Sequence, residues 1–296
     1  MYVFPNNFAY RAPETLAEAF DLLEANPWDG KLLAGGHSLL PMMKLRMAAP
    51  ELLIDINKIE ELKGISEQDG YLRIGALTHH GDLERALHLV PIYPLLACTA
   101  RWIADPSIRN RGTVAGSLVH ADPASDWGTT MLALHAEVEA ASKSGRRRMA
   151  IDDFFVDTFT TALEEGELVS AVYVPTPVGE PHARYMKLER KSGDFAIAGL
   201  AVQVETDTEG VVSQAGFGIC ACGSTPLRAV EAEQALVGQC LTADVIEHVS
   251  AVVSNSAEPT SDLRGTAQYK RDLLRVFAKR ALTEIAAEHS GEERVS

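Results

Sequence analysis

The sequence has few cysteines and no cysteine pair at the spacing of metal ligands. Among 296 residues the cysteines are Cys98, Cys220, Cys222 and Cys240. No C-x-x-C motif occurs, and Cys220 and Cys222 would point to opposite faces of a strand that contains both. A structural zinc or an iron–sulfur cluster bound by this chain is therefore not expected. Reduced, partly buried thiols are the expected state, as in a cytosolic protein.

Basic charge and long apolar runs are also scarce. Lys and Arg number 27 against 41 Asp and Glu, which gives a formal net charge of −14 and argues against a nucleic-acid partner. The only basic run, Arg146 to Arg148, follows Gly145 and is typical of a solvated turn. No run approaches the roughly 20 apolar residues of a membrane helix. The first residues carry neither a positive region nor a secretory core, so we expect a cytoplasmic protein without a transmembrane segment.

Two stretches of small residues stand out. One is Ala34-Gly35-Gly36-His37-Ser38 after a short apolar strand, and the other is residues 112–117, Gly-Thr-Val-Ala-Gly-Ser. Such backbone presents several N–H groups in one direction and can cradle an anion, and two loops of this kind can hold a pyrophosphate from both sides. Neither stretch fits G-x-x-x-x-G-K-[ST] or G-x-G-x-x-G. From the residues alone, two tight glycine turns in a globular protein remain an equally good interpretation.

Hydrophobic periodicity predicts an α+β fold. Strands are expected at 8–13, 31–34, 52–56, 71–76, 168–175, 185–188, 198–205 and 211–220, and a hairpin around 136–151. Helices are expected at 15–24, from 78, at 91–104, 127–134, 227–236, 244–253 and 268–289. His79 and His80 lack a third ligand nearby, and His80 is expected on a helix surface rather than in a metal site. We expect boundaries near residues 57, 176 and 290, which separate 1–57, 58–176, 177–290 and a polar tail, 291–296.

Several motifs resemble, in order, those of one family, and the resemblance covers nearly the whole chain. Residues 34–44 resemble a first FAD loop, and Thr113-Val114-Ala115-Gly116-Ser117 resembles T-x-G-G-[NS]. Residues 103–106, 121–126, 166–168, 187–194, 221–228 and 269–271 add further matches. The family is that of the flavoprotein (medium) subunits of molybdenum hydroxylases, of the aerobic carbon monoxide dehydrogenase type. It implies a two-subdomain FAD-binding domain of the vanillyl-alcohol oxidase/PCMH type, followed by an α+β C-terminal domain with helices on one face of an antiparallel sheet.

The resemblance also implies a FAD site, with no catalytic side chain and no metal ligand. The pyrophosphate would lie between two segments, which are Leu33, Ala34, Gly35, Gly36, His37, Ser38 and Leu39, and Thr113, Val114, Ala115, Gly116 and Ser117. Asp126 would lie near the ribityl chain, Ile103 and Leu168 beside the flavin, and Lys187 near its pyrimidine edge. Tyr185 and Asp194 also match positions near the ring. His37 has two interpretations, a FAD contact or a histidine that only packs the loop.

One residue departs from the family pattern. Ala115 stands where the family usually has the first glycine of its pair. If that position requires a positive φ, alanine there costs on the order of 1 kcal/mol. Loss of FAD and a purely structural role is one alternative that follows from this departure.

The implied function is that of an electron-transfer subunit. Electrons would leave a molybdenum–pterin centre in a large subunit, pass two [2Fe–2S] clusters in a small subunit, and reach an external acceptor through the FAD of this chain. Such assemblies are commonly dimers of heterotrimers. The substrate of the large subunit stays open, whether carbon monoxide, an N-heterocycle or another aromatic. A stand-alone FAD-dependent oxidase or reductase of the same superfamily is the other enzyme class to consider. A triad of Ser117, His120 and Asp122 lacks suitable spacing.

Overall fold

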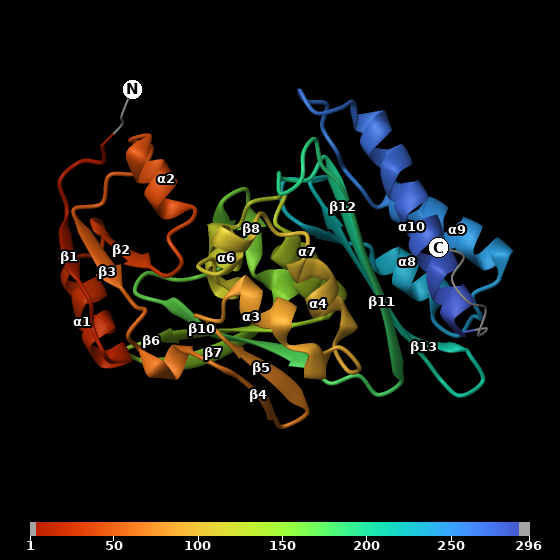
Figure 1. The fold of residues 1–296 in the computed structure, drawn as a ribbon, viewed down its shortest axis with the longest axis horizontal. Helices are drawn as coiled ribbons and strands as arrows, with labels where there is room; N and C mark the ends of the chain where they lie inside the picture. Colours follow the sequence, from red (N-terminus) through yellow and green to blue (C-terminus); the bar gives the residue numbers. More distant parts are fainter. Residues whose placement is uncertain (1–3, 290–296) are drawn as a thin grey trace.

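The computed structural model describes residues 4–289 and contains three main sheets side by side (Figure 1). The first is a small parallel sheet in the order β1-β3-β2, with two helices. Thr15 caps the first of these helices by accepting a hydrogen bond from the Glu18 backbone N–H, and its apolar side covers the sheet. The elements are β1 (Ala9–Arg11), α1 (Leu16–Ala25), β2 (Gly30–Leu33), α2 (Leu39–Lys44) and β3 (Leu52–Asp55).

The second sheet has five antiparallel strands in the order β4-β5-β10-β6-β7, with short helices between β5 and β6. Its strands are β4 (Ile65–Gln68), β5 (Tyr71–Gly75), β6 (Glu137–Ser142), β7 (Gly145–Ala150) and β10 (Leu168–Pro175). The helices are α3 (His80–Arg85), α4 (Pro94–Ala100), α5 (Pro106–Arg109), α6 (Val114–His120) and α7 (Asp126–Ala133). A small hairpin pairs β8 (Phe155–Asp157) with β9 (Thr160–Thr161). Short 3₁₀ turns occupy Glu60–Leu62, Leu87–Leu89 and Ile151–Asp153.

The third sheet is an antiparallel meander, β11 (Glu180–Leu188), β12 (Ala198–Thr206), β13 (Val212–Cys220) and the two-residue β14 (Leu227–Arg228). Figure 1 shows α8 (Val230–Leu236), α9 (Ala243–Asn255) and α10 (Ala267–His289) on one face of it. The α+β class and the one-sided helical layer predicted from the sequence are confirmed. The predicted tail, 291–296, lies outside the described residues.

The other face of the third sheet packs against α4 and α7 of the preceding part (Figure 1). Two glycines of β13 allow this contact. A Cβ at Gly216 would overlap the carbonyl oxygen of Ala133, and one at Gly218 would overlap that of Thr129. The backbone of α7 therefore rests directly on the strand, and the C-terminal sheet holds α7 in place.

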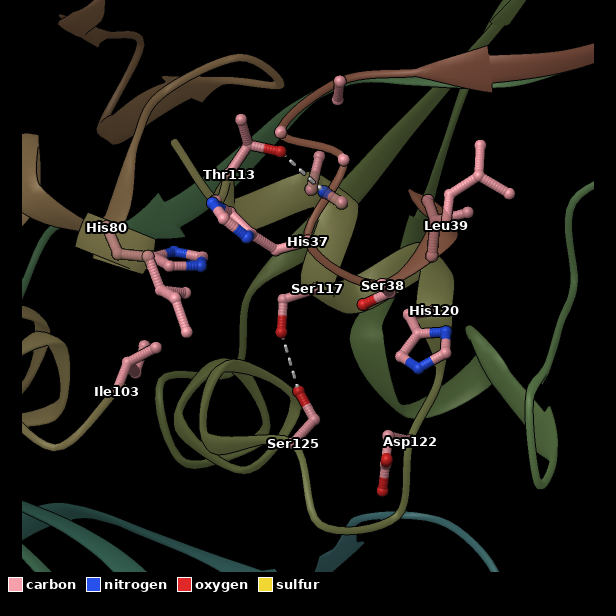
Figure 2. A pocket seen from close by; sticks show the side chains of 18 of the residues that line it. His37, Ser38, Leu39, His80, Ile103, Thr113, Ser117, His120, Asp122 and Ser125 are labelled. Carbon is pink, nitrogen blue, oxygen red and sulfur yellow. Dashed lines mark hydrogen bonds between the residues drawn. The ribbon is translucent and has the colours of Figure 1, made fainter. Parts of the chain in front are cut away.

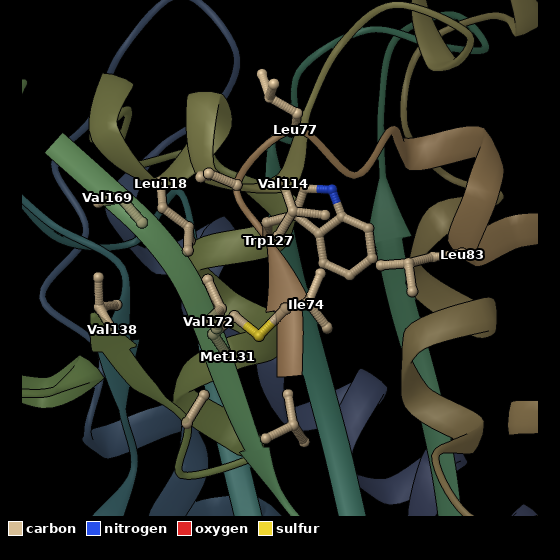
Figure 3. Close-up of a cluster of buried hydrophobic side chains, with 14 of the residues drawn as sticks. Ile74, Leu77, Leu83, Val114, Leu118, Trp127, Met131, Val138, Val169 and Val172 are labelled. Atoms are coloured by element: carbon tan, nitrogen blue, oxygen red, sulfur yellow. The ribbon is translucent and has the colours of Figure 1, made fainter. Parts of the chain in front are cut away.

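Trp127 of α7 is the largest fully buried side chain at the centre of the second part. Figure 3 shows it among Ile74, Leu83, Val114 and Met131. Burying side chains of this size contributes about 1.5–3 kcal/mol each. α7 is consequently fixed from both sides, by this core and by β13.

Several predictions about individual segments are wrong. The helix expected over 91–104 covers only Pro94–Ala100, and the stretch 227–236 begins as strand β14 before α8 starts at Val230. Residues 113–117, expected as a loop, include the first turns of α6. His80, expected on a helix surface, is only 5 % exposed. No helix within residues 4–289 is long and apolar enough to cross a membrane.

Candidate functional site

A cavity of about 550 Å³ is lined by residues from the three portions of the chain that contain the three main sheets. Its walls come from the segment after β2, from α3 and α6, from the start of α7, and from β10 and β11. Figure 2 shows His37, Ser38 and Leu39 of the first segment together with Thr113, Ser117 and His120 of the second. A cavity of this size accommodates a large ligand.

The segment after β2 forms the first wall. Gly36 has a φ of +78°, a conformation that glycine adopts without strain, and it turns the chain from β2 into α2. Within residues 4–289, the backbone N–H groups of Gly35, Gly36, His37 and Ser38 have no hydrogen-bond acceptor. Unpaired N–H groups in succession make an anion-binding concavity. His37 is exposed at the cavity wall.

The second wall is the beginning of α6. Thr113 caps this helix, since its Oγ1 accepts a hydrogen bond of 3.1 Å from the Gly116 N–H. Ala115 lies in the first turn, is 4 % exposed and does not have a positive φ. The strain expected if this position required a positive φ is therefore absent, and alanine, a good helix former, suits the position.

A buried ion pair forms part of the cavity wall. Lys187 Nζ lies 3.0 Å from Asp126 Oδ2, and the Tyr185 hydroxyl donates to Asp126 Oδ1 at 2.5 Å. Lys187 also donates to the Trp102 carbonyl at 3.3 Å and lies 3.5 Å from Glu189. Burial raises the pKa of Asp126, and the charge of Lys187 opposes that rise. The pair places two charges at the cavity wall with their fields largely cancelled.

Most of the residues predicted for the site line this one cavity. They are Leu33, Ala34, Gly35, Gly36, His37, Ser38, Leu39, Ile103, Thr113, Ala115, Gly116, Ser117, Asp126, Leu168, Lys187 and Asp194. Two others do not. Val114 packs into the core beside Trp127, because the first turn of α6 points it inward. Tyr185 lies behind Asp126 and reaches the cavity only through that carboxylate.

Sequence reasoning missed several lining residues. They include Lys31, Met42, His80, Asp122, Ser125, Leu163, Glu167, Val169 and Phe195. Some of them, such as Asp122, Ser125 and Glu167, lie in stretches that match family motifs, in which other residues were singled out. His80 was noticed in the sequence, and its position was predicted wrongly.

Hydrolytic chemistry has little support in this cavity. The hydroxyl of Ser117 pairs with that of Ser125 at 3.1 Å (Figure 2), and no bond joins it to His120. Among the described residues no group of three His, Cys, Asp or Glu side chains is placed to hold a metal ion. Lys31 and Lys187 are the lysines of the lining, against Asp122, Asp126, Glu167 and Asp194. A phosphate bound here would therefore rely on backbone N–H donors.

Comparison with known proteins matches the chain to two family models. Residues 6–177 match the model of the FAD binding domain in molybdopterin dehydrogenase, and residues 183–285 match that of the CO dehydrogenase flavoprotein C-terminal domain. The chain is 41% identical over 280 residues to the carbon monoxide dehydrogenase medium chain of Hydrogenophaga pseudoflava, covering 95% of this chain and 97% of the other. It is 30% identical to the xanthine dehydrogenase FAD-binding subunit of Escherichia coli O157:H7, covering 96% and 97%.

Solved structures of related enzymes have a similar fold. The carbon monoxide dehydrogenase from Hydrogenophaga pseudoflava superposes with a TM-score of 0.91 at 42% identity, covering 96% of this chain and 99% of that one. The quinoline 2-oxidoreductase from Pseudomonas putida 86 gives a TM-score of 0.89 at 29% identity, covering 98% and 99%.

Proposed function

The chain belongs to the family of FAD-binding medium subunits of molybdenum hydroxylases, and from this premise we propose that it transfers electrons through a bound FAD. It is an oxidoreductase component. The electrons come from iron–sulfur clusters of a partner subunit and leave to an external acceptor. FAD supplies the redox chemistry, and the protein binds and orients it.

One observation carries the proposal. Two separate backbone segments, residues 35–38 and the first turn of α6, meet at the same cavity. Within residues 4–289 the N–H groups of residues 35–38 have no acceptor. In the first turn of α6 the Ala115 N–H also has none, whereas Val114 and Gly116 are already bonded. Gly35 brings the two segments into backbone contact. Such an arrangement suits a pyrophosphate, which needs several donors from two sides. FAD thus fits the donors that the chain presents.

The remaining residues of the site take the roles that their positions allow. Ile103 and Leu168 offer apolar surface that would exclude water from the flavin. Asp126 keeps unused acceptor capacity for a ribityl hydroxyl beyond its bonds to Lys187 and Tyr185. Lys187 would set the local charge near the ring, moderated by Asp126. Asp194 lies at the cavity wall near Phe195.

The partners that we propose are a small [2Fe–2S] subunit and a large subunit with the molybdenum–pterin centre. We propose a dimer of heterotrimers. The names of the relatives support the presence of partner subunits, since they call these proteins medium chains or a subunit of a dehydrogenase complex. Those names also include nicotine and caffeine enzymes, so the substrate of the large subunit stays open. The cytoplasmic location stays a prediction.

We also retain, as a proposal, the division into 1–57, 58–176 and 177–290. The first sheet ends at Asp55, and the third begins at Glu180 after the last strand of the second, which ends at Pro175. Limited proteolysis would test the boundary near 176. Cleavage confined to residues 176–179 supports it, and cleavage within β10 or β11 contradicts it.

The decisive experiment is native affinity purification of the full chain, with cofactor spectra of everything that co-purifies. Two partner chains with flavin absorbance, iron–sulfur absorbance and molybdenum support the proposal. A yellow monomer that oxidises a small molecule unaided replaces it with the stand-alone flavoenzyme. A colourless chain that does not bind added FAD leaves a structural subunit.

A further inference from the structure

His80 is fixed at the cavity wall by its own backbone and by its neighbour Gly112. Its backbone N–H donates to the Gly112 carbonyl at 3.0 Å. A Cβ at Gly112 would lie 2.5 Å from His80 Nε2, so the imidazole occupies the space that a side chain would fill. Gly112 directly precedes Thr113, the cap of α6. The ring edge that carries Nε2 therefore lies at the base of the second FAD segment (Figure 2).

Trp127 determines which ring nitrogen carries the proton. Its indole Nε1–H lies 2.9 Å from His80 Nδ1, and an indole nitrogen can only donate. His80 Nδ1 must then be the acceptor, which places the imidazole proton on Nε2. Trp127 is fully buried in the core shown in Figure 3 and cannot turn away. The tautomer is thus set by packing.

The ring also stays neutral. Burial lowers the pKa of His80 to about 3, with further lowering from His79, His37 and Arg109. A second proton would have to displace the Trp127 hydrogen bond at Nδ1. At neutral pH the group is a neutral donor, unlike a surface histidine.

This donor has no partner in the protein. Within residues 4–289 nothing accepts a hydrogen bond from His80 Nε2, although the side chain is 5 % exposed and lines the cavity. His80 Nε2 is not among the fully buried unpartnered atoms of the described residues, so this donor faces the cavity. A ligand that excludes water from this donor has to accept its hydrogen bond, because an unpaired donor is then costly. We propose, on the premise that FAD occupies this cavity, that His80 is a FAD-binding residue whose Nε2–H donates to an acceptor atom of the cofactor, in a tautomer fixed by Trp127.

The acceptor has one of two sources in FAD. A phosphate oxygen lies in the half of the molecule that ADP shares, whereas a carbonyl or ring nitrogen of the flavin lies in the half that FMN carries without the adenylate. The Nε2 position beside Gly112 is at the junction of the phosphate segment and the flavin side marked by Ile103. Binding of ADP, FMN and FAD to the same variants separates the two sources.

Two substitutions at His80 test the roles of the two ring nitrogens separately. The amide nitrogen of glutamine in His80→Gln falls near the position of Nε2 and keeps the cavity donor. The amide of asparagine in His80→Asn falls near Nδ1, keeps an acceptor for Trp127 and loses the cavity donor. We expect His80→Asn to weaken FAD binding about threefold to tenfold and His80→Gln to stay within about twofold of wild type. His88→Asn, at an exposed histidine outside the cavity lining, is the control and should change nothing.

A second measurement begins with the wild-type chain, so it does not depend on whether the His80 variants fold. Nitrogen-15 NMR of histidine-labelled full chain without FAD should show His80 as the Nε2–H tautomer at pH 5.5 to 8, and titration with FAD should shift its Nε2–H proton. Trp127→Phe should release the tautomer preference.

The outcomes separate this inference from the proposed function. If the wild-type chain binds no FAD, the proposed function fails. If it binds FAD but His80→Asn binds as tightly, or the Nε2–H proton does not shift, the role of His80 is overturned. Equal weakening by His80→Gln and His80→Asn also overturns it, since the loss would then come from packing.

Discussion

Gly35 lies against Arg111, so that a Cβ at Gly35 would overlap the Arg111 carbonyl oxygen and lie 2.8 Å from the Cα of Gly112. The two segments that line the cavity are thus in backbone contact at one point. Neither Arg111 nor Gly112 can move aside as a flexible side chain would. The distance between the two walls therefore depends on the absence of a side chain at Gly35.

Gly35→Ala is therefore expected to separate the segments. We predict a loss of stability of about 1–3 kcal/mol, typical of overpacking, and at least tenfold weaker FAD binding. Chemical denaturation and FAD titration of the full chain measure both. Gly81→Ala is the matched control, because its new Cβ would meet the guanidinium end of Arg85, at 2.8 Å, which can move. Normal FAD binding by Gly35→Ala would show that the backbone contact does not set the site.

Glu233 of α8 connects the third sheet with the segment after α7 through charged contacts. It binds Arg228 at 2.7 Å, accepts from the Phe217 N–H at 3.2 Å, and lies 3.5 Å from His135 Nε2. Burial raises the pKa of Glu233, but His135 and Arg228 lower it by more, and the pKa ends below its usual value. A lowered carboxyl pKa gives stability that is present above about pH 4.5 and is lost as the pH falls through the folded-state pKa.

Glu233→Gln should remove this pH dependence. At pH 7 we expect it to cost about 1.5–3 kcal/mol, the range for hydrogen bonds to charged groups. Because the wild type loses its advantage as its carboxylate protonates, the difference should shrink as the pH falls from 5 toward 3. Urea unfolding at several pH values tests this. The exposed Glu231→Gln on the same helix should leave the profile unchanged, and a constant difference across the range would contradict the assignment.

The Asp126–Lys187 pair offers a test on the cofactor itself. Among the described residues, Asp126→Asn would leave Lys187 with Glu189, at 3.5 Å, as its one remaining charged partner. The added positive field at the cavity should raise the midpoint potential of bound FAD by tens of millivolts, since about 1.4 kcal/mol corresponds to about 30 mV in a two-electron couple. Spectroscopic redox titration measures it. The double variant Asp126→Asn, Lys187→Gln restores neutrality and should return near the wild-type potential. An unchanged potential in Asp126→Asn would mean that the pair lies too far from the flavin to act.

The class of the fold was predicted from residue type and alternation, which are local features, whereas most of the predicted site residues were implied by the family resemblance. The glycine pair at residues 35 and 36 and the strands of the third sheet follow from residue type and alternation. Placement of His80 failed because α3 is only six residues long and is covered from both sides by Gly112 and Trp127, contacts that lie more than 30 residues away. Tyr185 is expected near the ring from the resemblance alone. The structure adds that its hydroxyl donates to Asp126, a contact that alternation along β11 does not reveal.

Residue 115 shows that the stability effect of a residue also depends on structure that the sequence does not reveal. Small residues at 113–117 indicate a loop as well as a helix start, and only the capping bond from Gly116 to Thr113 decides between them. The helix makes Ala115 favourable where a loop with positive φ would make it costly. The two possibilities predict opposite effects of the same substitution.

Ala115→Gly should therefore destabilise the chain by about 1 kcal/mol, through the entropy of glycine in a helix and the loss of a buried methyl group. Ala121, at the other end of α6, is a comparison site at which glycine is expected to have the opposite effect. It has a φ of +50° and ψ of 39°, a left-handed conformation that costs an L-residue roughly 1–2 kcal/mol. Ala121→Gly relieves that strain and should be neutral or stabilising, even though Ala121 is also buried. Urea unfolding of the two variants side by side decides the matter. If Ala115→Gly were stabilising, residue 115 would belong to a strained loop after all, and α6 would have to begin later than Val114.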